Sequence, residues 1–276
     1  MSLFVASLNS GSNGNCYYLG NGEDHILVDG GISCRETEKR LKRLGLTLKK
    51  IKAVFITHEH GDHVHGVSSI SRKYKIPVYI TTNTRQNGRL ELREELTATF
   101  KPYDPITIGT ISITAFPKTH DASDPHSFIV ECKGVKVGVF TDIGIACDHV
   151  TANFKQCHAA FLESNYDCDM LAMGRYPWHL KERIRGGKGH LSNDQARQLV
   201  VDHKPAFMTH LFLSHLSQDN NSPKLVKSVF EKIAGQTEVI IAGRKKETKL
   251  YHIRSNFTRP RFSQPASHSF QQLSIF

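Results

Sequence analysis

The sequence lacks the features that would place it in or beyond a membrane. Its 276 residues contain no apolar run of transmembrane length, and residues 1–15 have no basic region ahead of their apolar stretch, as a secretory signal would. Its six cysteines are scattered, with no CxxC pair and no compact spacing. These absences predict a cytoplasmic protein with free thiols and no membrane partner.

Acidic residues are fewer than basic ones. Aspartate and glutamate total 26 against 36 lysines and arginines, which leaves a net charge of +10. Such an excess favours a polyanionic partner, of which nucleic acid is the commonest. It gives no indication of a protein partner.

The chain also lacks an obvious domain linker. With 39% hydrophobic residues it can bury a sizeable core, and we predict a single domain over residues 1–255. After about Asn256 the sequence is polar, has no periodicity and contains two prolines. We predict that residues 256–276 form a poorly ordered C-terminal tail.

Short apolar segments alternate with charged, helix-like ones, which favours two packed sheets with helices outside. Two helices have clear start signals: a capping box at Ser192 to Gln195, and Ser222 followed by a proline. A helix is also predicted at 84–97. The predicted strands are 3–8, 15–19, 25–28, 51–57, 76–81, 106–116, 127–132, 135–141, 159–162, 206–209, 237–242 and 248–253.

The most informative motif is HxHxDH at residues 58–63, directly after the apolar strand at 51–57. Side chains two apart on an extended segment point the same way, so His58 and His60 can hold one ion together. A turn at Gly61 would then let Asp62 and His63 face a second ion. Nitrogen and oxygen donors of this kind suit zinc, with manganese or iron as alternatives.

Later strand ends supply further candidate ligands. His120 follows one strand and Asp142 ends another, and a carboxylate there can bridge two cations. His210 and His215 lie near the end of a third. Each is weak evidence alone, but their order after HxHxDH is informative.

That order resembles the metallo-β-lactamase superfamily over nearly the whole chain. The resemblance implies an α/β fold, the αββα four-layer sandwich of two mixed β-sheets flanked by helices, with two divalent metal ions at one edge. It implies that His58, His60 and His120 hold one ion. It further implies that Asp62, His63 and the final histidine hold the other, that Asp142 bridges, and that Asp29 supports the site from behind.

Several segments are similar to the YycJ/WalJ group of bacterial proteins, which has 5′-to-3′ exonuclease activity on DNA. They are GSNGNC (11–16), HDASDP (120–125), FTDIG (140–144), LESNYD (162–167), RYPWHLKERIRGGKGHLS (175–192) and HLSQDNNSP (215–223). One departure is Tyr166, where the group's pattern has histidine.

The pattern also resembles RNase Z, in which a glutamate and a histidine cooperate as a proton-donating pair. Glu163 and His190 stand at the matching positions, and His215 matches the last metal ligand, with His210 as its competitor. The resemblance implies hydrolysis of a phosphodiester by a hydroxide that bridges the metals, with Asp62, Glu163 and His190 as the catalytic residues.

Basic and aromatic residues precede His190 and are candidates for binding phosphates and stacking on a base. A glycine-rich turn at 10–15 can also donate backbone N–H groups to a phosphate. The candidate substrate-binding residues are Arg175, Trp178, Lys181, Arg185, Lys188, Ser12 and Asn13. Trp178 could equally be a core residue, and the turn could be purely structural.

Three functions remain open from the sequence. The first is a metal-dependent nuclease, with DNA favoured over RNA by the resemblance alone. The second is a small-molecule hydrolase that cleaves a thioester, a lactone or a cyclic phosphodiester. The third is a metal-stabilised nucleic-acid-binding module without turnover.

Overall fold

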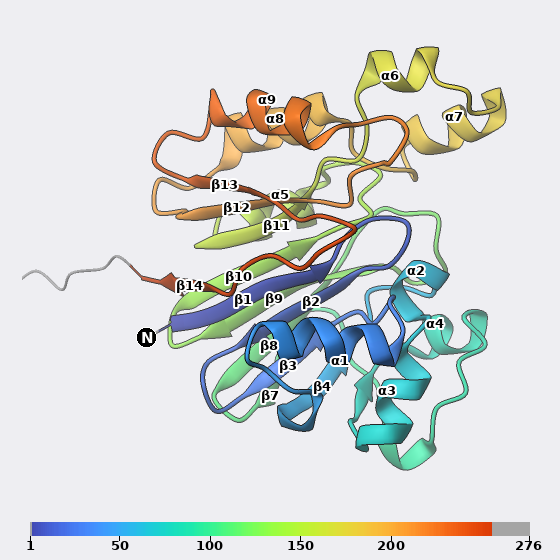
Figure 1. Cartoon of the computed structure of the whole chain (residues 1–276), viewed down its shortest axis with the longest axis vertical. Coiled ribbons are helices and arrows are strands. Elements are labelled where there is room, and N and C mark those ends of the chain that lie inside the picture. Colours follow the sequence, from blue (N-terminus) through green and yellow to red (C-terminus); the bar gives the residue numbers. More distant parts are fainter. Residues whose placement is uncertain (1, 256–276) are drawn as a thin grey trace, which may run out of the picture.

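The computed structural model describes residues 2–255, which form two seven-stranded mixed sheets (Figure 1). The first sheet has the order β14-β1-β2-β3-β4-β5-β6 and the second the order β13-β12-β11-β10-β9-β8-β7. Their strands are β1 (Ser2–Asn9), β2 (Cys16–Gly20), β3 (His25–Val28), β4 (Ile51–Phe55), β5 (Val78–Tyr79), β6 (Thr97–Ala98), β7 (Ile106–Ile108), β8 (Ile111–Pro117), β9 (His126–Cys132), β10 (Val135–Phe140), β11 (Ala159–Glu163), β12 (His210–Ser214), β13 (Glu238–Ile241) and β14 (Tyr251–Arg254).

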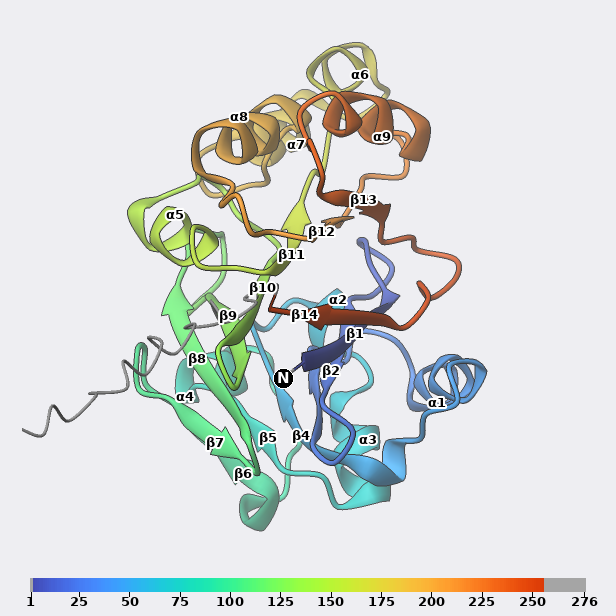
Figure 2. The same cartoon turned by 90° about the vertical axis from the view of Figure 1, so that its left-hand side faces the viewer.

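Helices cover both outer faces of the paired sheets, so the predicted αββα sandwich is confirmed (Figure 2). The helices are α1 (Cys34–Arg43), α2 (Gly61–Val64), α3 (Val67–Tyr74), α4 (Thr82–Asn87), α5 (Asp148–Phe154), α6 (Cys168–Met173), α7 (Trp178–Arg185), α8 (Asn193–His203) and α9 (Pro223–Glu231), with short 3-10 turns at Leu48–Lys50 and Glu94–Leu96. Between residues 2 and 255 no helix combines the length and the apolarity needed to cross a membrane.

The period of two along each strand explains the layers. In β1, Leu3 and Val5 enter the core between the two sheets, whereas Ala6 and Leu8 pack under α1 and α3. In the second sheet, β10 sends Val137 and Val139 into the same central core. The outer face of the second sheet is buried against α5, α8 and α9. One apolar centre therefore joins both sheets.

Three sequence predictions of secondary structure were wrong. The strand predicted at 106–116 is a hairpin, because Gly109 adopts a left-handed φ of 61° and a side chain there would collide with Asp24. The strand predicted at 206–209 lies at 210–214 instead, on the Leu-Phe-Leu run. The helix predicted at 84–97 ends at Asn87, before Gly88.

Both helix start signals are confirmed. Ser192 and Gln195 form the reciprocal capping box, and the Ser222 hydroxyl accepts a hydrogen bond from the amide of Leu225. The hairpin between β9 and β10 also forms as predicted. The prediction of a poorly ordered tail at 256–276 lies outside the described residues.

Parallel strands bring the candidate ligands to one edge. β3 and β4 run parallel, with Val28 opposite Phe55, so Asp29 and the HxHxDH segment leave the first sheet together. β10, β11 and β12 also run parallel, and the segments beginning at Asp142, Glu163 and His215 leave the second sheet together. Residues distant in sequence therefore meet where the two sheets face each other.

Candidate metal centre and proton-donating pair

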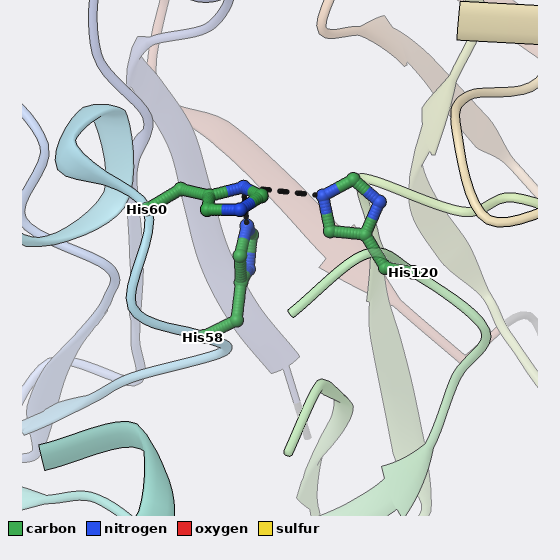
Figure 3. A group of neighbouring side chains, drawn as sticks. All are labelled: His58, His60 and His120. Carbon is green, nitrogen blue, oxygen red and sulfur yellow. Dashed lines mark hydrogen bonds between the residues drawn. The ribbon is translucent and has the colours of Figure 1, made fainter. Parts of the chain in front are cut away.

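Three histidine nitrogens converge at this edge (Figure 3). His60 Nδ1 lies 3.2 Å from His58 Nε2 and 3.3 Å from His120 Nε2. Nitrogens bound tetrahedrally to one zinc ion at about 2.0–2.1 Å would lie about 3.4 Å apart. The spacing of the three imidazoles therefore fits a single cation between them.

The surrounding residues determine which ring nitrogen faces the centre. His120 Nδ1 donates to the carbonyl oxygen of Gly189 at 3.0 Å, which leaves its Nε2 lone pair facing the other two imidazoles. Thr57 Oγ1 donates to Asp29 Oδ2 at 2.9 Å, so it can accept from His58 Nδ1, also at 2.9 Å. Such hydrogen bonds behind the ligands hold each ring in the tautomer that a metal requires.

A second group lies beside the first and contains Asp62, His63, Asp142 and His215. His63 Nδ1 donates to Asp29 Oδ2 at 2.7 Å, and its Nε2 lies 3.0 Å from Asp142 Oδ2. Asp62 Oδ2 lies 3.4 Å from His215 Nε2 and 3.5 Å from His63 Nε2. These atoms are close enough to share one cation.

Asp142 provides a direct test of whether a cation fits. Its Oδ2 atom is buried and accepts no hydrogen bond from the described residues when His63 is neutral, because His63 Nδ1 then carries the proton toward Asp29 and the Nε2 atom 3.0 Å away carries a lone pair. A buried carboxylate oxygen without a donor is costly, and a bound cation removes that cost. Its Oδ1 lies 3.9 Å from His120 Nε2, so Asp142 stands between the two groups. The donor set therefore fits two neighbouring divalent ions.

The two groups differ in their electrostatics. Burial holds the pKa of His58 far below its usual range and lowers the pKa of His120 to about 4. Both rings are therefore neutral and can offer a nitrogen lone pair to a metal ion. Burial alone would also lower the pKa of His63, but Asp142 and the neighbouring carboxylates outweigh it and raise this pKa to about 10. The second group therefore favours positive charge, which either a proton or a metal ion can supply.

Backbone conformation distinguishes three residues of this edge. Asp29, Asp142 and His215 have φ angles of 60°, 54° and 55°, in the left-handed region that few side chains other than glycine adopt. Each is the first or second residue after a strand. Four other described residues, Lys75, Arg89, Tyr103 and Lys133, share this conformation in turns elsewhere, so at this edge it serves to turn the chain after the strand and aim each side chain.

Glu163 links the last histidine of the second group to His190. Its Oε1 accepts from His190 Nδ1 at 2.8 Å and from His215 Nδ1 at 3.0 Å. Its Oε2 accepts from the amides of Ile143 and Leu191. Burial opposes ionisation of Glu163, yet His190 and these hydrogen bonds lower its pKa to about 2. These contacts therefore favour the charged carboxylate, which accepts hydrogen bonds from both imidazoles.

The two histidines that compete for the place of the last ligand, His215 and His210, lie in different parts of the structure. His210 lies at the opposite end of β12 from His215, where it contacts Thr209 and Glu238 instead of the clustered ligands.

Tyr166, the departure from the group pattern, is buried, and its backbone pairs with Ser192. Gly61 begins α2 and does not form a left-handed turn; it is α2 that directs Asp62 and His63 to the second group.

The predicted substrate-binding residues fall in three places. Lys188 lies in the loop whose Gly189 carbonyl holds His120, next to the clusters. Ser12 and Asn13 contact Arg244 on another wall. The remaining residues lie on and before α7, which projects beyond the second sheet: Arg175, Trp178, Lys181 and Arg185 (Figure 1). Trp178 is 73% exposed and is not a core residue.

Three site residues were missed from the sequence. Thr57 precedes HxHxDH and contacts both His58 and His63. Lys118 is buried two residues before His120, and its Nζ donates to the Thr141 carbonyl. The side-chain amide nitrogen of Asn15, Nδ2, donates to Asp62 Oδ2 at 3.1 Å. All three sit inside motifs already noticed. A polar residue close to a candidate ligand in sequence was the available signal for Thr57 and Lys118, whereas Asn15 meets Asp62 only through the fold.

Gly31 gives a testable link between backbone packing and this site. A Cβ atom at Gly31 would collide with the carbonyl oxygen of Asp62 and come within 2.7 Å of the Asn15 amide nitrogen. Because backbone atoms cannot move aside cheaply, we expect Gly31→Ala to destabilise the fold by about 1–3 kcal/mol and to impair metal binding. Thermal unfolding and metal titration measure both effects.

Gly61→Ala is the matched control, because a Cβ at Gly61 meets no atom within 4 Å. We expect it to leave the melting temperature and the metal content close to wild type. Equal behaviour of the two variants would contradict the packing argument.

Comparison with known proteins identifies the class. Residues 24–215 match the family model described as "Beta-lactamase superfamily domain". The chain therefore belongs to the β-lactamase superfamily and is a metal-dependent hydrolase of the metallo-β-lactamase fold. The fold matches solved structures at low sequence identity, including the metallo-β-lactamase fold protein YhfI from Bacillus subtilis, with a TM-score of 0.70 and 16% identity over 90% of this chain and 99% of that one.

Two relatives at higher sequence identity indicate a narrower group within the superfamily. The chain is 35% identical to exodeoxyribonuclease YycJ of Bacillus anthracis, over 82% of this chain and 87% of that protein. It is 31% identical to exodeoxyribonuclease WalJ of Streptococcus pneumoniae, over 79% of this chain and 83% of that protein. The resemblance noted from the sequence is confirmed.

Proposed function

We propose that this protein is a two-metal exonuclease that degrades DNA in the 5′-to-3′ direction. The observation that carries the proposal is the pair formed by His190 and Glu163, 2.8 Å apart and adjoining the second ligand group. A phosphodiesterase needs a proton donor for the leaving oxygen at this place. The exodeoxyribonuclease names of the relatives support DNA as the substrate.

We assign His58, His60 and His120 to one ion, Asp62, His63 and His215 to the other, and Asp142 to both. Zinc suits this nitrogen-rich set best, with manganese or iron as alternatives. Bound there, divalent ions would supply Lewis acidity toward the phosphate and lower the pKa of the attacking water.

The protein's own groups then divide the proton transfers. Glu163 holds His190 through Nδ1, so Nε2 is the atom that donates a proton to the leaving oxygen. The His190 side chain is 19% exposed, which leaves it accessible to substrate. Asp62 has a side chain 22% exposed, and its oxygen can accept a hydrogen bond from the attacking water.

Substrate binding follows from the charge and the projecting helix. Lys188 lies beside His120, where it can neutralise a phosphate next to the one that is cleaved. Arg175 and Arg185 are exposed near Trp178, whose ring is available to stack on an unpaired base. We propose that α7 guides a single-stranded end toward the metal groups.

The test is an assay of metal-replete protein on end-labelled single- and double-stranded DNA, the matching RNA, and a thioester. We expect 5′-labelled DNA to release labelled mononucleotide first, whereas 3′-labelled DNA shortens progressively. Cleavage of the thioester alone would contradict the nuclease proposal and favour a small-molecule hydrolase. Binding of DNA without any cleavage would favour a non-catalytic module.

A further inference from the structure

A cavity of about 580 Å³ lies beside the segment that follows His215. It is formed by the segments that follow β12 and β13, together with Ser10. Figure 2 shows the β13–β14 connection, in red, and the β1–β2 loop, in blue, near each other at this place. Pockets of about 300–1,000 Å³ are the usual size for a small organic ligand.

Arg244 is the fixed cationic group of the cavity. Its Nη1 donates to Gln218 Oε1 at 2.8 Å, and its Nη2 donates to the Leu216 carbonyl at 3.0 Å and to Ser12 Oγ at 3.4 Å. A guanidinium has five N–H donors, so one on Nε and one on Nη1 remain available. Each of these two N–H groups can donate a charge-assisted hydrogen bond to a phosphate oxygen.

The charge of Asp219 acts on Arg244, but no ion pair joins the two side chains. Glu247 lies in the same lining, but its carboxylate is held in two hydrogen bonds by Arg43. The nearby Asp219 accepts a hydrogen bond from the Tyr176 hydroxyl at 2.8 Å. Within residues 2–255, no carboxylate forms an ion pair with Arg244 or with the neighbouring Lys245 and Lys246. The cavity therefore has an excess of positive charge.

One loop connects this cavity to the metal ligands. Ser10 lines the cavity, and its hydroxyl accepts the backbone amide of His215 at 2.7 Å. Asn15, at the end of the same loop, contacts Asp62 and His63. Gly11 makes room between them, because a Cβ there would lie 2.9 Å from Arg244 Nη2. The loop that lines the cavity therefore also contacts the two ligand groups.

We propose that this cavity binds one nucleotide unit of the DNA strand, with its phosphate on Arg244. The inference rests on the proposed nuclease function and names a binding subsite for its substrate. Lys245 and Lys246 are exposed at the rim and add charge. Leu216, Pro223 and Ile241 offer an apolar wall to a base, and Gln218 and Asn221 offer amides to its polar edge.

The experiment measures binding and two hydrolysis reactions. Binding of a 5′-phosphorylated, fluorescent single-stranded oligonucleotide is followed by polarisation in EDTA, where no metal-dependent step contributes. Turnover is measured on the same oligonucleotide and on bis(p-nitrophenyl) phosphate, which is too small to reach both the cavity and the metal groups. The variants are Arg244→Gln, Arg244→Lys and the control Lys155→Gln. Lys155 is exposed and follows α5, near the start of β11, whereas Glu163 is the last residue of that strand.

We expect Arg244→Gln to weaken oligonucleotide binding about tenfold and to reduce the slope of log affinity against log salt by about 0.7. Arg244→Lys should keep the salt slope but recover only part of the affinity, because it lacks the planar fork. Lys155→Gln should match wild type, and all three variants should cleave the small phosphodiester within twofold of wild type.

Two results would overturn the subsite. One is binding by Arg244→Gln that equals wild type; the other is an equal loss of turnover on both substrates, which would mean that Arg244 only supports the fold. If wild type binds the oligonucleotide through Arg244 but cleaves no phosphodiester, the subsite stands and the proposed nuclease function fails. The two proposals are therefore tested separately.

Discussion

Asp142→Asn is expected to lower nuclease turnover by about a thousandfold or more and to reduce the bound metal content. The carboxylate lies 3.0 Å from His63 Nε2, 3.3 Å from His215 Nδ1 and 3.9 Å from His120 Nε2. Removing its charge removes the anion shared by both ligand groups, and with it the Lewis acidity that they are proposed to hold. Asparagine retains the size of aspartate and tolerates the left-handed φ of 54°.

The measurements are metal content by elemental analysis and turnover on end-labelled DNA. Asp148→Asn is the matched control: this carboxylate is exposed at the start of α5 and should affect neither quantity. Full activity of Asp142→Asn at wild-type metal content would contradict the assignment of Asp142 as a ligand of both ions. A fall in metal content without a fall in turnover would show that the metal is structural.

Glu163→Gln is expected to lower turnover on DNA by about a hundred- to ten-thousandfold. Four N–H groups point at this one carboxylate: His190 Nδ1, His215 Nδ1 and the amides of Ile143 and Leu191. A glutamine offers one carbonyl oxygen and turns an NH₂ group toward donors. In either orientation the NH₂ group faces two donors, and the two imidazoles lose the negative charge of their common acceptor. The buried mismatch costs about 1–3 kcal/mol of stability.

A comparison with His190→Gln separates the two imidazoles. p-Nitrophenolate leaves without protonation, so a variant that lacks only the proton donor should retain activity on bis(p-nitrophenyl) phosphate while losing it on DNA. We expect this split for His190→Gln. Glu163→Gln should lose both activities, because it also removes the negative charge that holds His215. Equal losses of His190→Gln on both substrates would mean that His190 is not the proton donor.

Local patterns predicted several of the side chains that cluster at this edge, because their spacing is local. HxHxDH places its donors within one strand end and one short helix, so their convergence depends on few dihedral angles. The capping box at Ser192 and the β9–β10 turn formed as predicted for the same reason. The hairpin at Gly109 was missed, since the collision with Asp24 that requires its left-handed φ involves a residue far away in the sequence.

The sequence by itself determined the donor atoms, their order along the chain and the excess of positive charge, since these belong to the residues whatever the fold. Only the tertiary structure decided that His215 and not His210 reaches the cluster, because the two lie at opposite ends of one strand. It also decided that Glu163 serves two imidazoles and that Arg244 faces a cavity beside them. Those relations are distances between separate strand ends, and sheet packing sets them.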